Sequence, residues 1–71
     1  MSQEMERLKK LLEHWIEHNS SHAQNYKEWA GKAQDDKRPN VAFELNQVAE
    51  LTDKITHHFQ RAKELLEERG K

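Results

Sequence analysis

Three histidines in the first half of the chain recur at intervals of four residues: His14, His18 and His22. In a helix, side chains four residues apart lie one above the other with their β-carbons about 6 Å apart, so neighbouring imidazoles could share one ion. The chain contains no Cys, which excludes thiolate ligands. A metal ion would therefore be held by nitrogen and oxygen, and imidazole suits Zn, Cu, Fe and Ni.

Other polar residues surround the three histidines. Glu13 and Glu17 directly precede His14 and His18, but consecutive helical residues point about 100° apart, so we expect both carboxylates to face solvent or to act indirectly. Asn19 and Tyr26 lie nearer the apolar side, where they could orient an imidazole through its second nitrogen. His18 is thus the central candidate ligand.

Two long stretches carry apolar or nearly apolar residues at alternating spacings of four and three, the pattern of a heptad repeat abcdefg. Positions a and d hold Met1, Met5, Leu8, Leu12, Trp15, Asn19, His22, Tyr26, Trp29 and Ala33, then Val41, Leu45, Val48, Thr52, Ile55, Phe59, Ala62 and Leu66. Position e is mostly small, and the residues at position g include Leu11, His18, Leu51, His58 and Leu65. The pattern predicts an all-α fold with helices over about residues 2–34 and 40–69.

The segment from 35 to 39 is predicted to form the turn, because Pro39 disfavours helical geometry at the residue before it and is tolerated in the first turn of a helix. Asp35, Asp36 and Asn40 are candidate caps. An alternative is a three-helix bundle, divided near Asn19 by the low helix propensity of residues 19–21. The unshifted heptad favours one continuous helix instead.

A short turn makes the two helices antiparallel neighbours. Counting residues outward from the turn along both helices pairs Trp15 with Phe59. In antiparallel helices position g of one faces position g of the other, so His18 is expected to approach His58. We therefore add His58 to the candidate metal ligands His14, His18 and His22. A single hairpin leaves part of its apolar face open, so we expect a homodimer that forms a four-helix bundle, or docking of another protein.

Composition restricts the remaining classes. The 71 residues suggest one small helical domain, and 12 basic against 13 acidic residues give a net charge of -1, which argues against nucleic-acid binding. No signal peptide or membrane span is recognisable, so we expect a cytoplasmic protein without membrane contact. The chain lacks an H-E-x-x-H motif, a Glu three residues before any His and a glycine-rich phosphate loop, so we do not expect an enzyme.

The string from His14 to Asn19, with His22 and the segment from Tyr26 to Ala30, resembles a family of short, mostly uncharacterised prokaryotic helical-hairpin proteins that carry H-W-x-x-H-N-x-x-H. The resemblance covers most of residues 8–66. It implies a role in handling transition metals, with nickel or cobalt as the ion, and implies His14, His18 and His22 as the shared positions. His58 rests on the register argument alone.

The sequence therefore leaves two hypotheses. In the first, the chain binds a divalent transition metal (Ni, Co or Zn) through its histidine cluster for storage, sensing or delivery. In the second, it is a structural or adaptor bundle that docks a protein partner. His22 would then be a neutral core residue bonded to Thr52, or the histidines would sense pH. His57, at position f, is expected to be an exposed surface residue.

Overall fold

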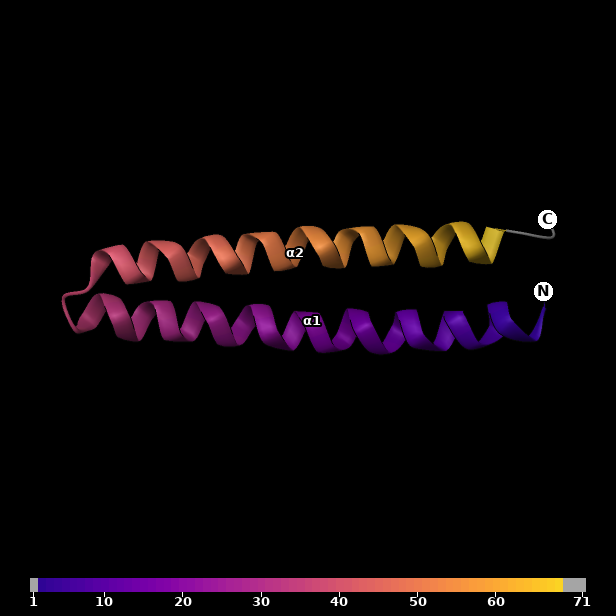
Figure 1. Cartoon of the computed structure of the whole chain (residues 1–71), viewed down its shortest axis with the longest axis horizontal. Helices are drawn as coiled ribbons and strands as arrows, with labels where there is room; N and C mark the ends of the chain where they lie inside the picture. The colour runs from indigo at the N-terminus through magenta and orange to yellow at the C-terminus, as the bar shows by residue number, and fades with distance from the viewer. Residues whose placement is uncertain (1, 69–71) are drawn as a thin grey trace.

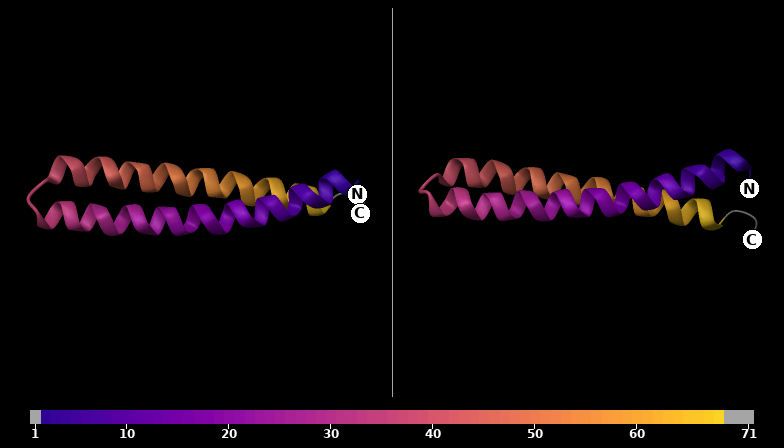
Figure 2. Two further views of the ribbon diagram at one scale, coloured as in Figure 1. Left: turned by 60° about the horizontal axis from the view of Figure 1, so that its bottom comes forward. Right: turned by 90° about the horizontal axis from the view of Figure 1, so that it is seen from below.

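Two antiparallel helices make up the fold (Figure 1). The computed structural model describes residues 2–68, in which α1 spans Gln3–Asp35 and α2 spans Pro39–Glu68. The all-α hairpin is confirmed, and the observed helix ends lie within one residue of those predicted, except that the predicted end at Arg69 falls outside the described residues. Neither helix is long and apolar enough to cross a membrane. The hairpin measures 53 × 15 × 12 Å, and its helices wind about each other (Figure 2).

The first helix begins at a side-chain cap and is not interrupted. The hydroxyl of Ser2 accepts a hydrogen bond of 3.1 Å from the backbone N–H of Met5, which satisfies one of the free donors of the first turn. The helix then continues through residues 19–21, so the three-helix alternative is wrong. Ala23 and Ala30, beyond this run, stay on the buried face, and their packing outweighs its low propensity.

The turn is a Schellman motif built on Lys37. The N–H of Arg38 donates to the carbonyl of Ala33 at 2.9 Å, and the N–H of Lys37 donates to that of Gln34 at 3.0 Å, which is the paired pattern of this motif. Lys37 has a φ of 61°, a left-handed conformation that costs a residue with a β-carbon about 1–2 kcal/mol. The carbonyl of Arg38 already accepts from Ala42 at 3.0 Å, so α2 starts at Pro39, one residue before the predicted start at Asn40. Asp36 ends α1 rather than capping α2.

Replacing Lys37 by Gly should stabilise the hairpin by about 0.5–1 kcal/mol, because Gly adopts a positive φ without strain and still loses more chain entropy on folding. Urea unfolding followed by circular dichroism measures the change. Lys37→Ala keeps the β-carbon and serves as the control, with no gain expected. Equal stabilities for the Gly and Ala variants would contradict the strain assigned to this turn.

The helices meet through positions a and e, not through a and d. The buried residues are Leu12, Ala23, Ala30, Ala42, Ala49, Thr56 and Leu66, and all of them occupy a or e. At position d, by contrast, Trp15 is 37% and Trp29 is 54% exposed. At 100° per residue the observed seam is rotated by about 50° from the predicted one. Small side chains at e let the backbones approach closely, and the large residues at d do not fit between them.

The rotated seam leaves one side of the hairpin apolar and uncovered. We call this side, formed by positions d and g of both helices, the open face. Eight large apolar side chains on it are substantially exposed: Leu11, Trp15, Trp29, Val41, Val48, Leu51, Ile55 and Leu65. Among residues 2–68, the one other exposed large apolar residue is Phe43, which lies at position f on a different side. The Lys32 ammonium group lies 4.1 Å over the ring of Trp29.

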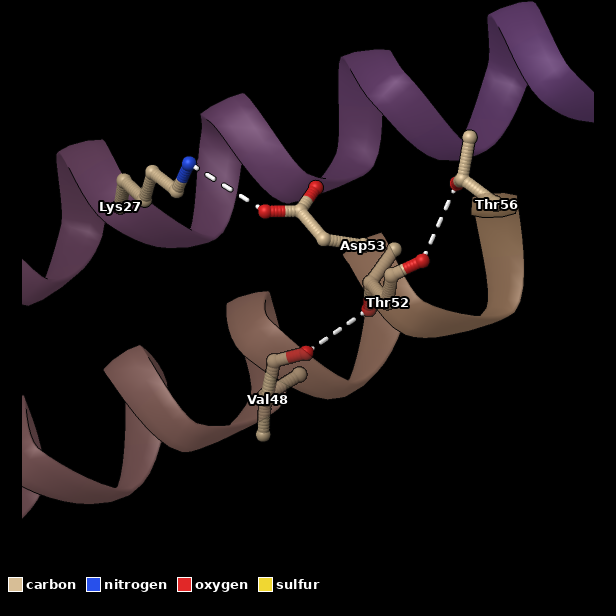
Figure 3. Close-up of polar contacts among 5 residues, drawn as sticks. All are labelled: Lys27, Val48, Thr52, Asp53 and Thr56. Carbon is tan, nitrogen blue, oxygen red and sulfur yellow. Dashed lines mark hydrogen bonds and ion pairs between the residues drawn. The ribbon is translucent and has the colours of Figure 1, made fainter. Parts of the chain in front are cut away.

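The opposite edge of the seam is charged. Ion pairs join Lys9 to Glu67 at 3.5 Å, Lys63 to Glu13 at 3.3 Å and Lys27 to Asp53 at 3.5 Å; the last is drawn in Figure 3. Exposed pairs of this kind are worth about 0.2–1 kcal/mol each, so they favour a register more than they stabilise the fold. The predicted pairing of Trp15 with Phe59 is confirmed on the open side, where their ring centroids are 5.5 Å apart.

Thr52 and Thr56 bring hydroxyl groups to the seam and satisfy them locally. Thr52 donates to the carbonyl of Val48 at 2.8 Å, and Thr56 donates to that of Thr52 at 3.0 Å (Figure 3). Such bonds to the preceding turn remove the cost of an unpaired buried hydroxyl. Thr56, only 5% exposed, therefore acts as a small seam residue like the alanines.

Enlarging a seam residue should destabilise the hairpin. Ala49 is 1% exposed, and Ala49→Leu should lower the free energy of unfolding by about 1–3 kcal/mol, because a close-packed contact has no room for the added carbons. The neighbouring variant Glu50→Leu places the same side chain in solvent and should change stability by less than about 0.5 kcal/mol. Chemical denaturation compares the two, and equal effects would contradict the alanine seam.

Candidate metal site

Four aromatic rings form a ladder along α1. This histidine ladder consists of His14, His18, His22 and Tyr26, each one turn from the next. The ring centroids are 5.6 Å apart between His14 and His18, 4.3 Å between His18 and His22, and 5.9 Å between His22 and Tyr26. The first and last pairs are stacked, whereas the central pair meets edge to face at 79°. The predicted stripe of three histidines thus forms a continuous row with its closest contact in the middle.

The central pair brings two nitrogen atoms together. Nε2 of His18 and Nε2 of His22 are 2.9 Å apart, so in the metal-free chain one of them donates a hydrogen bond to the other. Two imidazole ligands bound at about 2.0–2.1 Å lie about 2.9 Å apart at right angles and about 3.4 Å apart in a tetrahedral site. The pair therefore already has the nitrogen–nitrogen spacing of two ligands on one ion.

A shallow depression beside the ladder is lined by His14, Glu17, His18 and Ser21. Sequence reasoning treated Glu17 as a residue that faces solvent or acts indirectly, because it points away from His18. Glu17 is nonetheless three residues after His14, and residues at that spacing are neighbours on a helix surface. Glu17 therefore borders the same depression as His14 and His18, but it does not border the contact between His18 and His22.

The fourth candidate, His58, stands apart from the ladder. It is exposed on α2, and no hydrogen bond or ring contact links it to the histidines of α1 in the described part of the chain. Because the seam uses a and e, position g points about 140° away from the other helix. The predicted approach of His18 to His58 within one hairpin is therefore not found. Among residues 2–68, no three His, Asp or Glu side chains are grouped to hold a metal ion.

The structural roles suggested for neighbouring residues are met only in part. His22 is half-buried but makes no hydrogen bond to Thr52, whose hydroxyl donates to its own helix. Tyr26 stacks on His22 at an angle of 10° between the ring planes, so it supports the ladder through its ring. Asn19 is half-buried next to the seam. His22 is thus a half-buried residue whose ring contacts are with His18 and Tyr26 of its own helix.

The comparisons with known proteins place these features in an uncharacterised group. The sequence model of a family described as "Domain of unknown function (DUF8180)" matches residues 8–66. A protein of Archaeoglobus fulgidus described as "Uncharacterized protein" is 31% identical over 62 residues, which are 87% of this chain and 98% of that protein. No solved structure matches the chain. Both descriptions leave activity and ligand open, and the matched segment contains the whole ladder and His58.

Proposed function

Since the chain belongs to the family described as "Domain of unknown function (DUF8180)", its function has to be inferred from its own residues, and we propose that it binds a divalent transition metal. The ion is held by Nε2 of His18 and Nε2 of His22, and His14 stacks on His18 one turn away. The protein acts in storage, sensing or delivery of the ion and not as an enzyme. The observation that carries the proposal is the 2.9 Å between the two Nε2 atoms.

Three further features support this proposal. The ladder lies on the surface, so an ion reaches it without unfolding of the helix. Imidazole ligands suit Ni, Co and Zn, and the absence of Cys disfavours ions that prefer thiolates. The resemblance to hairpin proteins with H-W-x-x-H-N-x-x-H implies the same histidines and the same class of ion.

Removing either central imidazole should abolish tight binding. His18→Gln and His22→Gln should each weaken the affinity for Ni²⁺ or Zn²⁺ by at least about tenfold, because even loss of an outer partner of a metal ligand costs 10–100-fold. Titration calorimetry at neutral pH measures the affinity. His57→Gln, an exposed histidine at position f outside the ladder, is the matched control and should bind like the unmodified protein. Equal affinities for all four proteins would contradict the assigned ligands.

Metal binding should also stabilise the fold. An ion that binds only the folded chain adds about 2.7 kcal/mol at a free concentration one hundred times its Kd, which raises the melting temperature of a domain this small by about 10–20 °C. Thermal melts with and without Ni²⁺, Co²⁺ and Zn²⁺, each followed by a chelator, measure the shift. The His18→Gln variant should show no shift, and an unchanged melting temperature of the unmodified protein argues against a folded-state site.

The second candidate function is an adaptor that docks another protein on the open face. Eight exposed large apolar residues favour it, since patches of this extent mark interaction surfaces. The combined substitution of His14→Ala and His18→Ala separates the two functions. An adaptor keeps its stability and its partner, whereas a metal-binding protein loses the ion and the stabilisation that the ion brings.

A further inference from the structure

The open face has the dimensions of a stable protein interface. The hairpin is 53 Å long and 15 Å wide, so one flat side covers about 800 Å², which equals the share of one partner in an interface of standard size. Within the hairpin, meanwhile, the buried apolar residues are two leucines and four alanines. A core so limited is typical of a small chain that needs a partner to be stable.

The heptad itself identifies the occupant of this face. The large residues of the heptad are at positions a and d. The direction midway between a and d differs by about 50° from the direction midway between a and e, where the two helices of the hairpin meet. In a square four-helix bundle, the direction from a helix to the bundle axis differs by about 45° from the direction to its neighbour. The a and d pattern therefore matches the axis of a bundle of two hairpins, with e packed within each hairpin and g between them. Both halves of the chain share this pattern, so the matching partner is a second copy.

The same level along the axis is shared by His18 and His58. The ion pair of Glu13 with Lys63 joins the two helices at 3.3 Å. His18 and His58 each lie five residues closer to the turn than the member of this pair on their own helix. A two-fold rotation about the long axis keeps every residue at its level and sets α1 against α2 of the second copy. Position g then faces position g, so His18 meets the partner subunit's His58.

Other g positions support this arrangement. Lys32 comes to the level of the partner subunit's Glu44, an opposite charge, and Leu11 comes to the level of the partner subunit's Leu65, a second apolar residue. Asn25 comes to the level of the partner subunit's Leu51, so three of these four g pairs match in type or charge. A two-fold axis across the hairpin, centred on His18, would also pair opposite charges, Lys32 with the partner subunit's Glu4, but it would bring His18 to its own copy and not to His58. The long-axis arrangement is thus the one that joins the histidines of the two helices.

We propose that a second copy of this chain covers the open face and that the partner subunit's His58 completes the metal site begun by His18 and His22. The inference rests on the proposed function for its metal. The partner subunit's His58 is the third ligand, which a single hairpin lacks. Three imidazoles with one position left for water form an open site. By symmetry the dimer holds two such sites. An open site suits an ion that is exchanged rather than one that is buried as a structural element.

The first test is His58→Gln. In the dimer this variant should bind Ni²⁺ or Zn²⁺ at least about tenfold more weakly, as expected for a lost ligand, although His58 touches no ladder residue of its own chain. His57→Gln is again the matched control. Full affinity in His58→Gln, together with loss in His22→Gln, overturns the shared site and leaves the proposed function standing. If both variants bind metal with full affinity, or if the unmodified protein binds none, the proposed function itself is contradicted.

Complementation between chains gives the sharper test. The variant His18→Gln/His22→Gln lacks the pair on α1, and the variant His58→Gln lacks the residue on α2, so each alone should bind poorly. After unfolding and refolding as an equimolar mixture, about half of the dimers are mixed and each mixed dimer has one intact site, so the metal content should return to about one quarter of normal. Native mass spectrometry counts chains and ions together. Mixed dimers without retained metal overturn the inference.

The covered face is tested separately with two matched variants of α2. Leu51 on the open face is 57% exposed and Phe43 outside it is 59% exposed. Leu51→Lys should shift the protein to monomers in sedimentation velocity, while Phe43→Lys should stay dimeric. Because Leu51→Lys could also lose its fold, the melting temperature of the unmodified protein provides a second measurement: it should rise with chain concentration. A monomeric unmodified protein whose melting temperature is independent of concentration overturns the inference.

Discussion

Close packing of small side chains along one seam determines the rest of the structure. Ala23, Ala30, Ala42 and Ala49 are each at most 3% exposed, and they let the two helices lie close together over their part of the seam, while the larger Leu12 and Leu66 are buried elsewhere along it. This contact stabilises the hairpin only modestly, since alanine buries little apolar area. It also decides what is left outside. The aromatic and branched residues at d turn to one side, and the histidine ladder turns with them.

Much of the fold could be read from the sequence, because the heptad, the single proline and the polar segment before it all favour the same hairpin. The position of the seam could not. Positions a and e recur with the same alternation of three and four as positions a and d, so spacing does not distinguish them. Side-chain volume does: the small residues at e, such as Ala49, pack closely, whereas Trp29 at d stays half outside.

The candidate site was predictable to a similar extent. The regular spacing of His14, His18 and His22 identified them as candidates, and a straight helix is enough to align their side chains. The 2.9 Å contact between Nε2 atoms depends on side-chain rotation, which the sequence does not encode in its spacing. The expected contact of His18 with His58 failed for the same reason as the seam: a rotation of about 50° turns position g from the neighbouring helix towards the open face.

The ring pair of Trp15 and Phe59, with centroids 5.5 Å apart, gives the protein an internal optical reporter. Trp15 is three residues from His18, a rise of about 4.5 Å, whereas Trp29 is eleven residues away, about 16 Å along the same helix. Paramagnetic Ni²⁺, Co²⁺ or Cu²⁺ on the ladder therefore quenches the emission of Trp15 more strongly than that of Trp29. Diamagnetic Zn²⁺ lacks this effect. The fluorescence of the unlabelled chain would thus distinguish Zn²⁺ on the ladder from a paramagnetic ion.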